Sequence, residues 1–158
     1  MAKGKSVTKQ LLDASIAALF AGIEIHNKPH ISYRYSSSVI LIINAWELAL
    51  KAFVYKYIGK RNIYEGKDGH TISFKKAADA VRIHLNTIKP KSFEAVFDNL
   101  MLLNEYRCKD VHFIGAKIDP LMFMLISKAV LNYDEFIKVH FNKDITRDDN
   151  LIILPIGL

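Results

Sequence analysis

The chain has 158 residues, of which 51% are hydrophobic and 24% are charged, a composition that fits one globular domain and excludes a disordered chain. Its single cysteine, Cys108, excludes a disulfide framework and favours a reducing compartment, so we expect a cytoplasmic protein. The net charge of +6 favours a polyanionic partner such as RNA. No apolar signal region follows residues 1–6, and the longest apolar run, 39–50, is too short to predict a membrane span.

The first half of the chain carries two long helical patterns with a break between them. Residues 8–26 place apolar side chains on one face, and the Asn-Lys-Pro sequence at 27–29 ends that helix. Residues 36–58 carry a wider apolar stripe, and Gly59 is a suitable C-terminal stop. The glycine-containing stretch 59–69 predicts a mobile loop.

Three further helices are predicted in the second half. Ser73 is a good N-cap for a helix that reaches about residue 84, and Pro90 lies near the start of the next, over 92–111. The Asp-Pro pair at 119–120 is a strong start signal for the last helix, which ends near residue 140.

The remaining residues, 141–158, differ from the rest because their end is apolar, β-branched and broken by Pro155. They predict an extended segment that needs a partner surface, either the bundle itself or a further domain absent from this chain. No repeat or linker interrupts the sequence, so we expect a single domain over 1–158. The predicted fold class is all-α, an antiparallel bundle of about five helices with little or no sheet, apart from the tail.

A change from apolar to polar residues on the fourth predicted helix marks the strongest candidate site. Steps of three and four residues place Phe93, Phe97 and Leu100 on one face, and Asn104 and Arg107 continue that face. An arginine on the continuation of a core stripe is costly unless it is paired or lies at a cleft. The pattern therefore predicts that Arg107 belongs to a functional site.

His112 follows Arg107 by five residues, which turns an ideal helix by about 140°, so the two side chains diverge on one straight helix. They converge if the helix ends near Val111, or if two copies of the chain meet across a twofold axis. We therefore expect a homodimer with a composite cleft. Tyr106, next to Arg107, is the aromatic side chain best placed to stack on a base.

A second polar set, Asn44, Glu47 and Lys51, shares one face of the second predicted helix. Two interpretations stay open: Glu47 and Lys51 form an ordinary surface ion pair, or the set faces the cleft and Glu47 orients the arginine or histidine. No clustered histidines or carboxylates indicate a metal site, so we expect no metal and no cofactor. The histidines other than His112 are interpreted as surface or capping residues.

Three segments, at 23–29, 44–51 and 104–112, together resemble a bacterial family of unknown function within the HEPN superfamily, in the right order along the chain. The resemblance implies a helical bundle that dimerises. Many HEPN proteins are metal-independent ribonucleases of toxin–antitoxin, abortive-infection and CRISPR-associated defence systems. Their catalytic motif, an arginine followed a few residues later by a histidine, falls on Arg107 and His112.

This resemblance implies an endoribonuclease in bacterial defence or a toxin–antitoxin system, with RNA and an antitoxin or defence protein as partners. The residues suit that chemistry, because RNA supplies its own 2′-hydroxyl as nucleophile and an imidazole moves protons near neutral pH. A guanidinium stabilises the extra negative charge of the phosphorane. The expected products carry 2′,3′-cyclic phosphate and 5′-hydroxyl ends.

One residue departs from the family pattern, since the position after the arginine is usually polar, often Asn, and is Cys108 here. This departure favours a first alternative, a non-catalytic module of the same fold that binds RNA, a nucleotide or a protein partner. A second alternative, the sensing or dimerising half of a longer defence protein, is suggested by the apolar tail. The intact Arg107 and His112 pair and the net charge favour the nuclease.

Overall fold

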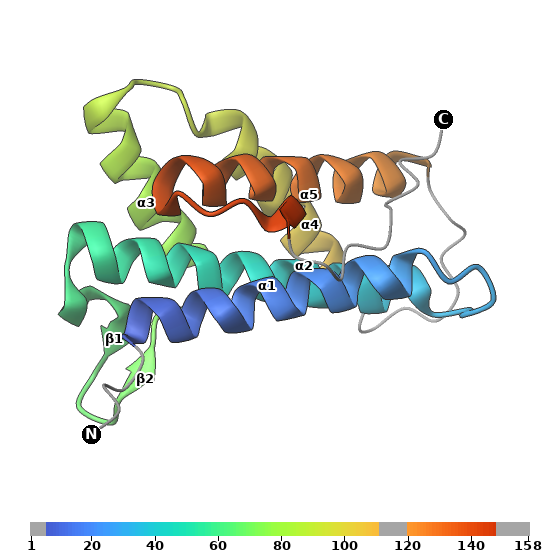
Figure 1. Ribbon diagram of the computed structural model, residues 1–158, viewed down its shortest axis with the longest axis horizontal. Helices are drawn as coiled ribbons and strands as arrows, with labels where there is room; N and C mark the ends of the chain where they lie inside the picture. The colour runs from blue at the N-terminus through green and yellow to red at the C-terminus, as the bar shows by residue number, and fades with distance from the viewer. Residues whose placement is uncertain (1–5, 111–119, 148–158) are drawn as a thin grey trace.

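The structure is a computed structural model that describes residues 6–110 and 120–147. Over these residues it contains five α-helices: α1 (Val7–His26), α2 (Arg34–Phe53), α3 (Phe74–Ile88), α4 (Glu94–Asp110) and α5 (Pro120–Phe141). α1 and α2 lie side by side along the length of the molecule, and α3 and α4 pack against α2, with α5 beside α4 and α2 (Figure 1). The predicted all-α class is confirmed.

α1 and α2 approach closely because Gly22 presents no side chain to α2. A Cβ atom at Gly22 would lie 3.0 Å from Cγ1 of Ile42 and 3.3 Å from the carbonyl oxygen of Ser38, so a larger residue forces the helices apart. The Ser38 hydroxyl donates to the Gly22 carbonyl at 2.9 Å, and the Ser15 hydroxyl donates to the Ala45 carbonyl at 2.6 Å. Hydrogen bonds across this interface therefore hold the two helices in register.

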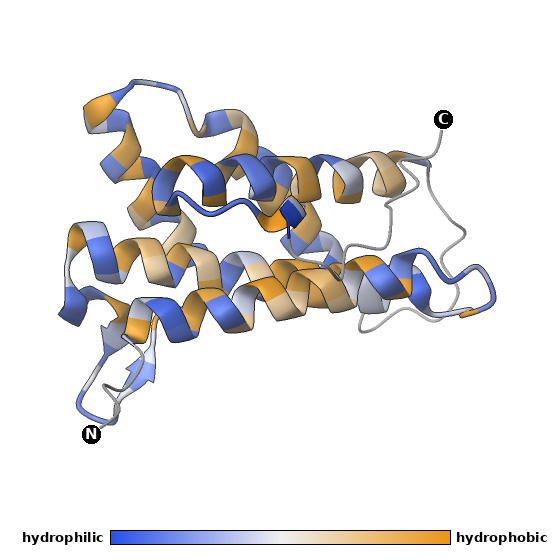
Figure 2. Ribbon diagram, viewed as in Figure 1, coloured by the Kyte–Doolittle hydropathy of each residue, from blue (hydrophilic) through white to orange (hydrophobic). Residues whose placement is uncertain are grey.

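The core is centred on Trp46 of α2, which is completely buried. Its indole N–H donates to the Ala129 carbonyl of α5 at 3.1 Å, and its ring meets that of Tyr133 edge-on at 5.5 Å. The Tyr133 hydroxyl lies 2.6 Å from the Ser15 hydroxyl, and burial raises the pKa of Tyr133 well above its usual range. In Figure 2, much of α2, the helix that carries Trp46, has the orange shades of hydrophobic residues.

α2 is followed directly by a π-helical turn, Val54–Ile58. The continuous helical stretch therefore ends at Gly59, as predicted. The 25-residue stretch Arg34–Ile58 is long and apolar enough to cross a membrane by length and composition alone. This differs from the sequence expectation that the run is too short. However, 67% of its most apolar window is buried by the other helices, as in the central helix of a globular bundle, so it is weak evidence for a span.

The starts of two helices follow from serine caps. The Ser6 hydroxyl accepts from the Lys9 N–H at 3.3 Å, and the predicted cap Ser73 accepts from the Lys76 N–H at 3.4 Å. α3 continues to Ile88, about one turn further than predicted. Asp119 and the apolar tail after residue 147 lie outside the described residues.

The stretch predicted as a mobile loop is instead partly ordered into a small hairpin. After a 3-10 turn, Lys60–Ile63, strand β1 (Tyr64–Glu65) pairs antiparallel with β2 (His70–Thr71). The four-residue turn between them begins and ends with Gly66 and Gly69, at φ angles of 68° and 72°. Glycine adopts these angles without strain, which permits a tight turn that the loop prediction overlooked.

Candidate functional site

The polar residues of α4 lie toward the end of the bundle where α5 begins. α4 runs antiparallel to α5: the Phe93 ring is 6.0 Å from that of Phe136, and the Asn99 amide donates to the Leu125 carbonyl at 3.2 Å. Arg107 follows eight residues after Asn99, about 12 Å further along the helix axis. Its side chain is half-buried, one turn before the end of α4.

Two asparagine side chains of α4, which precede Arg107, have a buried amide oxygen for which the described residues provide no hydrogen-bond donor. The side-chain oxygens of Asn99 and Asn104 are buried and have no hydrogen-bond partner within ranges 6–110 and 120–147. Leaving such an acceptor unpaired costs about 1–3 kcal/mol, so each calls for an explanation. Asn104 precedes Arg107 by three residues and shares its face. Asn104 and Arg107 are therefore both partly buried near the end of α4, and their functional role stays a prediction.

The neighbours of Arg107 are placed only in part. Tyr106 is half-buried and packs against the core, while Cys108 is exposed. His112 and Val111, on which the predicted convergence with Arg107 depends, lie outside the described residues. The Arg107–His112 site thus stays a prediction.

Glu47 and Lys51 form the ion pair that their spacing predicts, with 2.6 Å between Oε1 and Nζ. Lys51 is buried, and its amine also donates to the Thr71 hydroxyl of β2 at 2.9 Å. The pair therefore fastens the hairpin to α2. Asn44 is exposed, and no contact in the described part of the chain links this polar set to Arg107.

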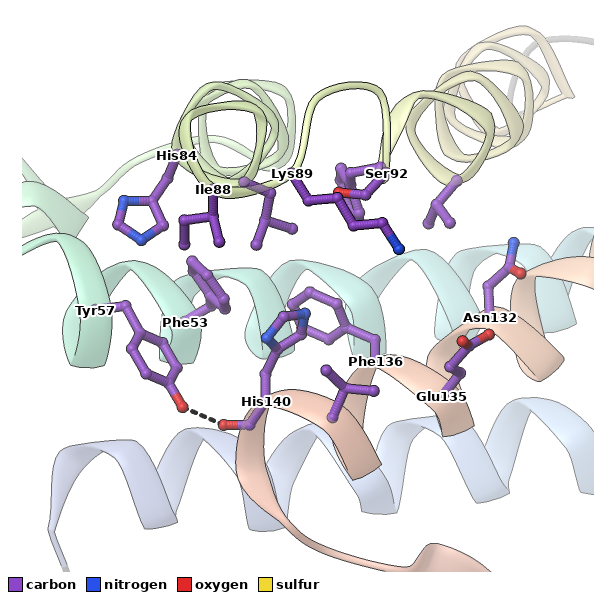
Figure 3. A pocket seen from close by; sticks show the side chains of 14 residues that line it. Phe53, Tyr57, His84, Ile88, Lys89, Ser92, Asn132, Glu135, Phe136 and His140 are labelled. Carbon is purple, nitrogen blue, oxygen red and sulfur yellow. Dashed lines mark hydrogen bonds between the residues drawn. The ribbon is translucent and has the colours of Figure 1, made fainter.

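A pocket of about 560 Å³ opens at the opposite end of α5, between the ends of α2 and α3 and the start of α4 (Figure 3). Its floor consists of three buried aromatic rings, Phe53 of α2, Phe136 of α5 and Phe93, which directly precedes α4. Around them stand polar and aliphatic side chains, namely Tyr57, His84, Leu85, Ile88, Lys89, Ser92, Val96, Asn132, Glu135, Val139 and His140. An apolar concavity with a few polar groups is the usual form of a small-molecule site.

Two histidines line this pocket and meet the same phenylalanine. The rings of His84 and His140 contact Phe53 edge-on, at 5.6 Å and 5.0 Å between centroids. Burial, and secondarily the positive charge of Lys56, lowers the pKa of His140, so this imidazole is neutral near pH 7. The Tyr57 hydroxyl donates to the His140 carbonyl and ties the end of α5 to α2 (Figure 3).

Sequence reasoning missed this pocket and interpreted both of its histidines as surface or capping residues. His84 lies one turn before Ile88 on α3, and His140 one turn after Phe136 on α5. That spacing beside an apolar residue was the only available signal. This signal is weak, because spacing within one helix does not reveal that α3 and α5 face each other across a concavity.

A third histidine, His26, is buried at the end where α5 begins. Its ring lies 5.4 Å from Tyr35 and 5.2 Å from Phe123, and its Nδ1 has no partner among the described residues. Burial, followed by the charge of Arg34, lowers its pKa. Removing water from this ring therefore favours the neutral form.

No group of three or more histidine, cysteine, aspartate or glutamate side chains suited to a metal ion occurs in the part of the chain that the structure describes. The two histidines of the pocket have Glu135 as their only acidic neighbour in its lining. The histidines and Glu135 of the pocket can accept and donate protons, and Lys89 can hold an anion.

Comparison with protein-family models matches the domain of unknown function DUF3644 over residues 10–158. The match spans nearly the whole chain, so the chain belongs to this family. Neither the curated proteins nor the solved structures gave a match.

Proposed function

We propose that this protein is a metal-independent endoribonuclease of HEPN type that acts through Arg107 and His112. The observation that carries the proposal is the end of the α4 stripe, where a core-facing row gives way to the half-buried Arg107 and to Asn104, whose side-chain oxygen has no partner in the described ranges 6–110 and 120–147. Polar groups in such positions are costly for stability and are common at functional sites. The net charge of +6 and the resemblance of 104–112 to the HEPN motif also support it.

The proposed reaction needs only the RNA and these side chains. The 2′-hydroxyl attacks the adjacent phosphorus, His112 takes its proton, and the bond from phosphorus to the 5′-oxygen breaks. The leaving oxygen is protonated by the histidine of a second copy of the chain, and Arg107 stabilises the charge on the phosphoryl oxygens. The products are a 2′,3′-cyclic phosphate and a 5′-hydroxyl.

A homodimer is part of this proposal, because one arginine and one histidine supply one proton acceptor but no separate donor. Two copies across a twofold axis supply both. A defence or toxin–antitoxin role, with an antitoxin or another defence protein as partner, is the context in which we expect such an enzyme.

The test is cleavage of a single-stranded RNA in EDTA, comparing the wild type with His112→Ala and Arg107→Lys. We expect the wild type to cut and to leave cyclic phosphate ends. His112→Ala loses about 10²–10⁴-fold in rate, and Arg107→Lys is not fully active because a point charge lacks the forked donors. Activity abolished by EDTA, or full activity of His112→Ala, contradicts the proposal.

A second candidate function is a non-catalytic binding module. The specific observation in its favour is the pocket between α3, α4 and α5, which lies at the far end of α4 from Arg107. Cys108, in the position that is usually polar in the motif, agrees with it. A wild type that cleaves no RNA but binds it makes this the better interpretation.

A further inference from the structure

We propose that the pocket between α3, α4 and α5 binds a free amino acid with an apolar or aromatic side chain. The carboxylate of the amino acid meets Lys89, its ammonium meets Glu135, and its side chain enters between the phenylalanines of the floor. Neither function proposed above assigns this class of ligand. Phe93 precedes Arg107 by 14 residues, about 21 Å at the rise of an α-helix, so the site is separate from the Arg107 end and does not depend on RNA cleavage.

Two opposite charges share the lining of this pocket without pairing. Lys89 is the C-cap of α3, Glu135 lies on α5, and both residues are exposed. In Figure 3 the Lys89 amine extends from the α3 side over the pocket toward α5, where Glu135 stands. Within ranges 6–110 and 120–147, no ion pair or side-chain hydrogen bond engages either residue. Both charges are therefore available to a ligand that carries both signs.

The combination of signs decides the class of ligand. An anion in the pocket would meet the carboxylate of Glu135 as well as the amine of Lys89, and a cation would meet the same two groups with the opposite sign, so attraction is offset by repulsion in each case. A zwitterion is attracted by both. An α-amino acid is the simplest zwitterion with an apolar group attached, and the flexible side chains of Lys89 and Glu135 can close on a molecule of this size.

Two neutral side chains supplement the charged rim. Asn132 stands beside Glu135 at one end of the pocket, and Ser92 follows Lys89 by three residues on the other side (Figure 3). Neither side chain makes a hydrogen bond to the residues that the structure describes. The amide oxygen of Asn132 can accept from an ammonium group, and the hydroxyl of Ser92 can donate to a carboxylate. Each charged group of the amino acid therefore has a second partner in the lining.

The floor and the mouth of the pocket select an apolar side chain. The Phe136 ring lies 5.8 Å from that of Phe53 and 6.0 Å from that of Phe93, and these three rings offer no hydrogen-bonding group. At the mouth, Ile88 of α3 and Val139 of α5 are 70% and 68% exposed, so a side chain inserted between them covers apolar surface. The volume also fits, since small-molecule pockets have about 300–1,000 Å³.

An apolar segment of a protein partner fits this lining less well. Its leucine or phenylalanine side chain would fill the same walls, but the peptide groups on either side carry no charge for Lys89 and Glu135. A free amino acid uses both the walls and the charged rim.

The experiment measures binding to the full chain by calorimetry, with L-phenylalanine, L-leucine and L-tryptophan as probes. We expect at least one of the three to bind, and three simpler molecules to bind more weakly. Phenethylamine lacks the carboxylate and 3-phenylpropionate lacks the ammonium, so each should lose about fivefold or more in affinity relative to L-phenylalanine. Glycine keeps both charges but lacks the side chain, and should lose about tenfold or more.

Matched variants test the two charges of the rim. Lys89→Gln and Glu135→Gln should each weaken binding of the amino acid by about fivefold or more. Lys75→Gln and Glu24→Gln remove the same charges at exposed positions outside the pocket lining and should leave the affinity unchanged. Circular dichroism and the thermal midpoint establish that each variant is folded.

Combining variants with analogues separates direct contact from a structural effect. If Glu135 meets the ammonium, removing the ammonium from the ligand should matter less in Glu135→Gln than in the wild type, because the interaction is already lost. Removing the carboxylate should likewise matter less in Lys89→Gln. A variant that only disturbs the pocket would weaken all of these ligands by the same factor.

Three results would overturn the proposal. The first is that none of the three amino acids binds the wild type. The second is that phenethylamine or 3-phenylpropionate binds as tightly as L-phenylalanine, which would indicate a site for a cation or an anion. The third is that Lys89→Gln and Glu135→Gln bind as well as their controls do. No titration contains RNA, so a failure of the cleavage reaction leaves each of these results intact.

Discussion

The two ends of α5 are built differently. Where α5 begins, the neighbouring α4 carries the polar side chains of Asn99, Asn104 and Arg107, half or fully buried, and the two amide oxygens have no partner within residues 6–110 and 120–147. Where α5 ends, phenylalanines from α2, from α5 and from the residue before α4 form the floor of a concavity, and polar groups stand around it. Among the described residues, the first end carries buried acceptors without a partner, and the second carries exposed apolar side chains.

This difference shows what each end can do. The donors of the Arg107 guanidinium suit the stabilisation of negative charge in a transition state, whereas the Asn99 and Asn104 oxygens can only accept a hydrogen bond. Uncovered apolar walls suit binding of a ring by its faces, which requires no chemistry. We propose reaction at the first end and binding at the second, and changing one end at a time tests this division.

The largest expected effect separates activity from stability. Arg107→Ala should reduce RNA cleavage by about 10²–10³-fold, by removing charge stabilisation, while its urea midpoint stays close to that of the wild type because the side chain is half exposed. Cleavage rates and urea unfolding of the same preparation measure both. An Arg107→Ala protein that cleaves at the normal rate would remove the reason for assigning chemistry to this end.

At the pocket end, in contrast, we expect a substitution to reduce the stability of the protein. Phe136→Ala removes a ring that is 5% exposed and contacts Trp46, Phe53 and Phe93, so it should cost about 3–5 kcal/mol of unfolding free energy. Val139→Ala, on the exposed side of the same helix, serves as the control and should change stability little. If Phe136→Ala is as stable as the control, the aromatic floor is not the structural base of this end.

Acid should weaken the folded state through one histidine at each end. His26 and His140 have folded pKa values below the unfolded value of about 6.5, so the unfolded chain binds more protons in that window and stability falls as the pH drops below 6.5. His26 should contribute more, since it is the more deeply buried.

The measurement is urea unfolding at pH 7.5 and pH 5.5 for His26→Gln and His140→Gln, with the exposed His30→Gln as control. The loss of stability between the two pH values should be smaller in the first two variants than in the wild type. An unchanged pH dependence in His26→Gln would show that its burial does not govern its protonation.

The smallest effect concerns Glu47, which belongs to neither end. Glu47→Gln should cost about 1 kcal/mol of stability, because the buried Lys51 keeps its bond to Thr71 but loses a partly exposed counter-ion. Glu24→Gln, which breaks the exposed Glu24–Lys28 pair, should have no measurable effect. Loss of RNA cleavage by Glu47→Gln that exceeds its loss of stability would revive the interpretation that Glu47 orients the catalytic residues.

Local sequence patterns predicted most of the fold. Ser73 and Gly59 marked helix ends because capping and termination depend on one residue and its immediate neighbours. The hairpin at 64–71 was overlooked because its strands have only two residues each, too few to show a period. The Glu47–Lys51 pair followed from i,i+4 spacing, whereas its bond to Thr71 depended on that hairpin.

The sequence by itself determined the all-α class, the helices and the change from apolar to polar along α4, because these depend on residues within a few turns of one another. Only the tertiary structure decided that Phe53, Phe93 and Phe136 meet, and that His84 and His140 stand on opposite sides of one pocket. Those residues come from α2, α3, α5 and the residue before α4, and their meeting depends on how the helices cross. Crossing is set by the packing of whole helical faces, such as the close approach at Gly22, which no local spacing encodes.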